Sequence, residues 1–288
     1  MSTGRAIFID RTVKRVMTIC AFSSLLFLFL IFLFILIEGL PLFYRVGLTN
    51  IIAGFKWAPT KGFFGIFPMI VSSFLVTFGS LALGGPLGLA CAVYLAEYAD
   101  KKKKLFLKPA LELLAGIPSV VYGFLGVLYI VPVIRNHLGG SGFSLLAAAI
   151  VLGIMILPTV ISISYDSLMS VPRAYREGSL AMGATKWQTT FRVVIPASIS
   201  GILAGFILGM GRAIGETMAV IMVAGNALKI PGSVLDPLRT LTSNIALELA
   251  YASGDHRIGL FSTGVVLLVI IMILNYIANF IVRRRIVR

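Results

Sequence analysis

Six long apolar runs constrain the fold of this chain more than any other feature. A helix needs about 20 mainly apolar residues to cross the hydrocarbon core of a bilayer. Runs of this kind, separated by charged segments, lie at residues 16–37, 68–95, 114–134, 144–165, 199–224 and 259–282. Only 12% of the residues are charged, whereas a soluble domain has about 25%. The pattern predicts an all-α integral membrane protein with six transmembrane helices.

The basic residues divide unequally between the two sides of such a bundle. The amino-terminal segment, the second and fourth connections and the carboxyl-terminal tail hold 17 lysines and arginines, whereas the other three connections hold seven. Cytoplasmic loops carry the Lys/Arg excess in multi-pass proteins, so both termini are predicted to be cytoplasmic. The lysine run 101–104 then lies beside anionic lipid headgroups. The net charge of +14 therefore indicates orientation in a lipid membrane and no nucleic-acid partner.

The first apolar run is interpreted as a retained helix. It is longer than the roughly 7–15-residue apolar core of a signal peptide, and no small-residue cleavage site follows it. The chain also has no G-x-x-x-x-G-K-[ST] stretch, no Ser/His/Asp or metal-ligand cluster, and only two histidines. We therefore expect no catalytic residue, cofactor or metal in this chain. A membrane-embedded enzyme is disfavoured, whereas a self-powered secondary transporter or channel is an alternative class.

The fourth connection, residues 166–198, has the pattern of two short helices. Gly183 suits the position just after a helix, and Thr185 with Gln188 has the spacing of a capping box at the start of the next one. The second helix is expected to end before Pro196. The pattern alone is consistent with a rigid knob that docks into another protein, or with a helix pair lying on the membrane surface.

One arginine, Arg212, lies inside the fifth apolar run. Arginine at the centre of a transmembrane helix costs about 2.5–3.5 kcal/mol on insertion scales, so we expect it to serve a function. In a continuous helix Glu216 lies on the same face, and we predict that its carboxylate holds the guanidinium. Glycines 201, 205 and 209 share this face. For Gly201 and Gly205 close packing against a neighbouring helix is the favoured interpretation, whereas the charged residues of this face predict that it meets a partner helix around a passage.

The chemistry of this charge pair suits an oxyanion. A planar guanidinium offers paired donors to phosphate oxygens. The carboxylate of Glu216 weakens the grip of Arg212 and accepts a hydrogen bond from a protonated oxyanion, which phosphate provides at neutral pH and sulfate does not. The pair therefore predicts passage of an oxyanion, and phosphate is our hypothesis for its identity.

Residues in the fourth connection resemble the EAA motif of ABC importer permeases. That motif has E-A-A, three residues, a glycine, nine residues and I-x-L-P. Glu177, Gly183 and Pro196 keep its spacing, whereas Gly178 and Ser179 stand where alanines are usual. In that family the loop forms coupling helices that sit in a cleft of a cytoplasmic ATPase. The resemblance thus implies that these five residues couple the chain to an ATPase.

Further segments resemble the PstC-type permease subunits of phosphate ABC importers. They include Gly-Arg-Ala-Ile-Gly-Glu-Thr-Met-Ala-Val at 211–220, Ile-Pro-Ser-Val-Val-Tyr-Gly at 117–123 and Thr-Leu-Thr-Ser-Asn-Ile-Ala at 240–246. The resemblance extends over roughly residues 55–251. It implies the type I ABC importer permease fold in the cell membrane, with an amino-terminal helix and external connection at 1–67 and a five-helix core at 68–288.

The same resemblance implies the function and the partners. The chain would be the permease that moves inorganic phosphate into the cytoplasm, with Arg212, Glu216 and Thr217 on the substrate path. Its partners would be a PstA-like sister permease, two PstB-like ATPase subunits, which bind ATP and Mg, and an external PstS-like phosphate-binding protein. A sulfate or molybdate permease, or a PstA-type subunit, are the alternatives within the family.

Overall fold

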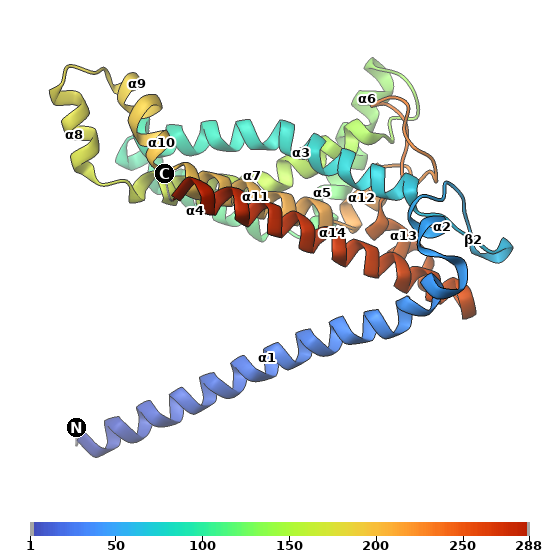
Figure 1. Ribbon diagram of the computed structural model, residues 1–288. Helices are drawn as coiled ribbons and strands as arrows, with labels where there is room; N and C mark the ends of the chain where they lie inside the picture. Colours follow the sequence, from blue (N-terminus) through green and yellow to red (C-terminus); the bar gives the residue numbers. More distant parts are fainter. Residues whose placement is uncertain (1–2, 287–288) are drawn as a thin grey trace.

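The protein is described here by a computed structural model covering residues 3–286, and it is helical apart from one small hairpin (Figure 1). The longer helices are α1 (Thr3–Val46), α3 (Phe67–Val93), α4 (Lys101–Gly116), α7 (Leu145–Ser170), α11 (Ile199–Gly215) and α14 (Gly254–Ile286). The shorter helices are α2 (Leu48–Ile52), α5 (Ser119–Leu125), α6 (Val131–His137), α8 (Arg173–Ala181), α9 (Lys186–Thr189), α10 (Ile195–Ala197), α12 (Met218–Val223) and α13 (Leu241–Glu248).

The remaining elements are short π-helical and 3-10 turns and the hairpin. Three π-helical turns join or extend helices: η2 (Tyr94–Tyr98), η3 (Gly126–Ile130) and η4 (Thr190–Val194). The hairpin pairs β1 (Trp57–Ala58) with β2 (Phe63–Phe64) across the 3-10 turn η1 (Pro59–Lys61). Both strands lie beyond the end of α1 that is far from the amino terminus (Figure 1).

The predicted all-α membrane fold is confirmed. Among the described residues, five helical stretches are long and apolar enough to cross a membrane: Asp10–Val46, Phe67–Tyr98, Ser119–His137, Leu145–Ser170 and Gly254–Phe280. A sixth candidate is the pair Lys186–Ala197 and Ile199–Gly215, which is bent by 69°. Figure 1 shows the beginning of α1, the end of α14 and the α8–α9 segment at the same end of the molecule, as the basic residues predict.

The core of the bundle is formed by α3, α7 and α11, which pack closely because small residues stand where they meet. A Cβ atom at Gly84 of α3 would meet the carbonyl oxygen of Gly153 on α7. Leu152, Met155 and Ile156 of α7 are fully buried in this core. The bundle is therefore held by close packing of apolar and small side chains.

The glycine face of α11 packs against α7. A Cβ atom at Gly201 would meet the Ser167 side chain, and one at Gly209 would lie 3.1 Å from Cγ2 of Val160. The hydroxyl of Ser167 also donates to the Ser198 carbonyl at 2.9 Å, which ties the start of α11 to α7. Close helix packing, the interpretation favoured for Gly201 and Gly205, is therefore confirmed, since a Cβ at Gly205 would also lie 3.3 Å from Ser164 Oγ of α7.

The fifth predicted span is not one continuous helix. α11 ends at Gly215, and Glu216 has extended backbone angles of −70° and 131° before α12 begins at Met218. Two glycines in its last turn, Gly211 and Gly215, have low helix propensity, and the Glu216 side chain satisfies a backbone donor of the following turn. The prediction of an unbroken helix over 199–224 is wrong at this point.

Candidate functional site

The fourth connection forms a compact knob, defined here as residues 173–194, that contains α8, α9 and η4. Gly183 has a φ of +81° and makes the left-handed turn after α8. The predicted capping box is present. The Gln188 backbone amide donates to Thr185 Oγ1 at 3.2 Å, and the Thr185 backbone amide donates to the side-chain oxygen Oε1 of Gln188 at 2.9 Å. Ser179 Oγ lies 2.9 Å from Thr189 Oγ1, which links the two helices. The local sequence thus specifies the knob.

The outer surface of the knob is apolar and exposed. Met182 is 88% exposed and Trp187 is 62% exposed. The ring of Trp187 lies 3.9 Å, centroid to centroid, from that of Phe191. Glu177 and Gly178 of α8 are also exposed, and a Cβ at Gly178 would meet nothing within 4 Å. Exposed apolar side chains in a group are typical of a protein-binding surface.

The helix after the knob continues through Pro196, whereas we predicted that it ends before this residue. The π-helical turn η4 makes this possible, because the Ile195 amide donates to the carbonyl of Thr190 five residues earlier. Proline has no amide hydrogen and clashes with a regular turn before it, and the wider turn accommodates it. Pro196 is exposed in α10, and the chain bends after it into α11.

Arg212 and Glu216 do not form an ion pair in the part of the chain that the structure describes. Glu216 instead accepts a hydrogen bond from the Ala219 amide on Oε1 at 3.1 Å, and thereby caps α12. Its backbone carbonyl accepts from Thr242 Oγ1 at 2.9 Å. The predicted pairing fails because it assumed a continuous helix, and the break after Gly215 turns the carboxylate toward the next helix.

Arg212 lies in the last turn of α11, half-buried, with no hydrogen-bond or ion-pair partner among residues 3–286. The negative end of the helix dipole favours a cation there. On the nearby helix α5, the Tyr122 hydroxyl donates to the Leu114 carbonyl at 2.8 Å. The third predicted path residue, Thr217, is half-buried in the helix break, and its hydroxyl donates to Gly215 at 3.3 Å.

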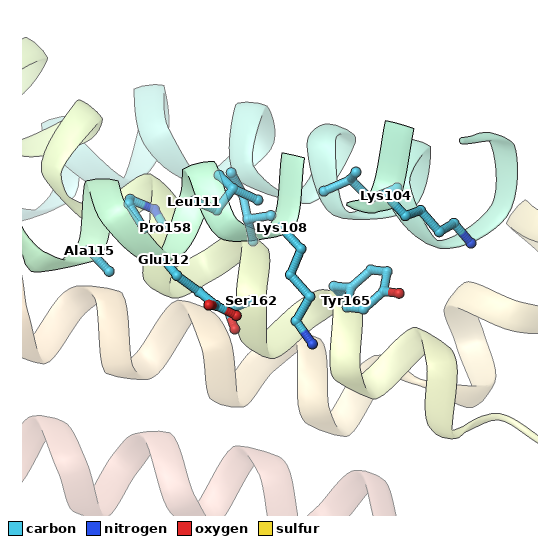
Figure 2. Close-up of a pocket in the computed structure, with 10 residues that line it drawn as sticks. Lys104, Lys108, Leu111, Glu112, Ala115, Pro158, Ser162 and Tyr165 are labelled. Carbon is cyan, nitrogen blue, oxygen red and sulfur yellow. The ribbon is translucent and has the colours of Figure 1, made fainter. Parts of the chain in front are cut away.

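A separate groove lies between α4 and α7 and contains none of the predicted site residues (Figure 2). Lys108 Nζ lies 5.9 Å from the centroid of the Tyr165 ring, and Lys104 Nζ donates to the Ala96 carbonyl at 3.1 Å. Figure 2 shows Glu112 pointing toward Ser162 one turn further along the groove. The rest of the lining is mostly apolar. The groove therefore lies along the contact between the amphipathic helix α4 and the bundle.

The structure adds an ion pair beneath the knob that the sequence did not reveal. The Arg176 guanidinium donates to Glu97 Oε1 through Nη2 at 2.7 Å and through Nε at 3.1 Å. Arg176 directly precedes Glu177 in α8, and Glu97 lies in η2 at the end of α3. The two residues are 79 positions apart, so no local pattern points to this contact.

A second buried polar cluster lies at the opposite end of the bundle. The Glu248 carboxylate of α13 accepts from Trp57 Nε1 at 2.8 Å and from Arg239 Nη1 at 2.7 Å. His256 Nε2 lies 2.8 Å from the same carboxylate. These contacts join the hairpin, α13, the start of α14 and the loop before α13, and none was predicted from the sequence.

Comparisons with known proteins agree on the family. The profile described as "Binding-protein-dependent transport system inner membrane component" matches residues 84–287. The chain is 41% identical over 278 residues to the probable ABC transporter permease protein YqgH of Bacillus subtilis (strain 168), which covers 92% of this chain and 90% of that protein. It is 34% identical over 250 residues to the phosphate transport system permease protein PstC of Mesorhizobium japonicum, covering 80% and 76%.

Among solved structures, the chain resembles one from a bacterial alginate ABC transporter in complex with an alginate-bound periplasmic protein. The TM-score is 0.67 at 16% identity, and the match covers 98% of this chain and 97% of that chain. At this identity the likeness shows the fold alone.

Proposed function

Because the chain belongs to the family of binding-protein-dependent transport system inner membrane components, it is a multi-pass, non-catalytic permease subunit of an ABC transporter, and we propose that it carries inorganic phosphate into the cell. Two groups of residues support the proposal. Arg212 provides the chemistry for an oxyanion, and the knob provides a surface for the ATPase that drives transport.

The guanidinium of Arg212, which has no hydrogen-bond or ion-pair partner in the described part of the chain, is the observation that carries the phosphate assignment. A cation inside a membrane-spanning helix is costly unless it faces water, a partner or a ligand. Its planar donors match the oxygens of phosphate. Glu216 uses Oε1 to cap α12, and Oε2 accepts no hydrogen bond from the described residues, so this oxygen is free to accept one from a protonated oxyanion.

The exposed knob supports coupling to an ATPase. Glu177 and Gly178 are exposed on α8, the rings of Trp187 and Phe191 line a groove against α3, and Ser179 links α8 to α9. We propose that Gly183 and Pro196 shape the knob and its connection to α11. Closure of the ATPase pair on ATP binding then moves the knob, and with it the spans, between outward- and inward-facing states.

The partners follow from the family and from the PstC relatives. We propose a PstA-like sister permease in a heterodimer, two PstB-like ATPase subunits that bind ATP and Mg, and an external PstS-like phosphate-binding protein. A sulfate or molybdate substrate is the alternative to phosphate, and the choice of anion in the assay separates these possibilities.

The test compares Arg212→Gln with Arg212→Lys in the assembled complex. Loss of hydrogen bonds to a charged group costs about 1.5–3 kcal/mol, so Arg212→Gln should lower phosphate uptake roughly 10- to 150-fold. Lysine keeps the charge without the paired donors and should recover part of the rate. Arg135→Gln, at an exposed arginine in α6, is the matched control. Unchanged uptake by Arg212→Gln in an intact complex would refute the assignment.

A further inference from the structure

Arg176 holds three helices together at the base of the knob. Its guanidinium belongs to α8 and donates to Glu97 in η2, with Nη2 to Oε1 at 2.7 Å and Nε to Oε1 and Oε2 at 3.1 and 3.4 Å. It also donates to the carbonyls of Leu168 and Val171, at 2.8 and 2.7 Å, at the end of α7. The side chains of Arg176 and Glu97 are only 21% and 9% exposed.

This arrangement provides strong donors to carbonyls at the end of α7, of which Leu168 otherwise has only a 3.4 Å hydrogen bond from the Val171 backbone amide. The last carbonyls of a helix have no partner within the helix and lie at the negative end of its dipole. The Arg176 fork neutralises that end of α7, and Glu97 balances the arginine charge. Because the guanidinium is planar and its donors have fixed directions, five hydrogen bonds fix the angle of α8 relative to α3 and α7.

A second contact joins the knob to the same turn of α3. Lys186 Nζ, at the start of α9, lies 4.9 Å from the centroid of the Tyr98 ring in η2. Both helices of the knob therefore contact η2. Glu177, the residue after Arg176, is exposed. In α8, therefore, Arg176 contacts the bundle while its neighbour Glu177 faces outward.

We propose that Arg176 and Glu97 form the joint that transmits movement of the knob to α3 and α7. The inference rests on the proposed docking of the knob onto an ATPase. Both residues are positioning residues, because they act through the helices they join. When the joint is intact, displacement of α8 displaces the ends of both helices. When it is broken, α8 tilts on its own and the spans do not follow.

The joint therefore predicts uncoupling rather than loss of docking. Glu97→Gln and Arg176→Gln leave the outer surface of the knob unchanged, so ATPase binding and basal ATP hydrolysis should stay within about twofold of wild type. Phosphate moved per ATP should fall, in the roughly 5- to 150-fold range typical of coupling between two sites. Arg176→Lys keeps the charge but loses the fork, and should show an intermediate ratio.

The experiment uses the full complex in proteoliposomes, with permease pair, ATPase and binding protein. ATP hydrolysis and radiolabelled phosphate uptake are measured in the same sample, and assembly is checked by co-purification of the ATPase. Asp100→Asn is the matched control, because it removes the exposed Lys103–Asp100 pair, at 3.9 Å, three residues after Glu97. This variant should keep the wild-type ratio.

A wild-type ratio in assembled Glu97→Gln and Arg176→Gln complexes would overturn the joint. If the glutamine variants fail to assemble, Arg176→Lys decides: a wild-type ratio overturns the joint, and a reduced ratio supports it. If wild-type complexes carry no phosphate, the proposed substrate is wrong. The joint is then judged by stimulation of ATP hydrolysis by the binding protein, which the variants should lose and Asp100→Asn should keep.

Discussion

The buried Glu248 cluster is expected to fix the hairpin to the bundle, and its removal gives a prediction of calculable size. The Glu248 side chain is 9% exposed and accepts from Trp57 Nε1 and Arg239 Nη1. His256 Nε2 contacts its second oxygen at 2.8 Å. Glu248→Gln removes the negative charge opposite Arg239. It also replaces one carboxylate oxygen by an NH2 group, which then faces Arg239 Nη1 or Trp57 Nε1, both of which are donors.

The hairpin contributes only Trp57 to this cluster, so the cost to the hairpin is that of its hydrogen bond to the Glu248 carboxylate. A hydrogen bond to a charged group is worth about 1.5–3 kcal/mol. Each 1.4 kcal/mol is a factor of ten in an equilibrium. Glu248→Gln should therefore raise the population of locally opened hairpin by up to roughly 10- to 150-fold, while the helices of the core stay closed.

Hydrogen–deuterium exchange of the purified subunit measures this opening. The Gly65 amide donates to the Lys56 carbonyl and the Ile66 amide donates to the Ile51 carbonyl, both at 2.9 Å. Both amides should exchange faster in Glu248→Gln by the factor above. Asp255→Asn is the control, because it removes the Arg45–Asp255 pair, whose side chains are each 63% exposed. Exposed pairs contribute little, so its exchange should match wild type. Unchanged exchange of the hairpin in Glu248→Gln would refute the reasoning.

Two further predictions concern glycines. Gly209→Leu should lower the apparent melting temperature of the subunit by roughly 2–12 °C, because a Cβ there lies 3.1 Å from Val160 and overpacking costs about 1–3 kcal/mol. Gly211→Leu is the control, since a Cβ there meets nothing within 4 Å, and it should leave the melting temperature unchanged. Equal shifts in the two variants would contradict the proposed packing of α11 on α7. Gly183→Val places a β-branched residue at a φ of +81°, which costs at least about 1–2 kcal/mol. It should reduce co-purification of the ATPase while membrane insertion is unchanged, and normal co-purification would argue against a role of this turn in docking.

The features predicted correctly from the sequence are those encoded by neighbouring residues. The apolar runs mark the spans because hydropathy is averaged over about 20 adjacent positions. The knob was predictable from Gly183, Thr185 and Gln188, since turn and capping signals act within a few residues. The spans and the knob were therefore predictable because each is determined by residues close together in the sequence.

The features that were missed depend on distant residues or on competition between local contacts. Arg176 and Glu97 are 79 positions apart, and Trp57 and Glu248 are 191 apart, so only the folded structure brings them together. The predicted pairing of Arg212 with Glu216 was wrong because a capping bond to the next helix competes with it. Helical periodicity locates a residue on a face only while the helix continues.

ATP hydrolysis by the reconstituted complex tests the central claim most directly. The complex is supplied with the binding protein and either phosphate or sulfate, and hydrolysis is measured together with uptake of the same anion. We predict that phosphate stimulates hydrolysis and enters the vesicles, and that sulfate does neither. Equal or greater stimulation and uptake with sulfate would contradict the account, as would an assembled complex that responds to neither anion.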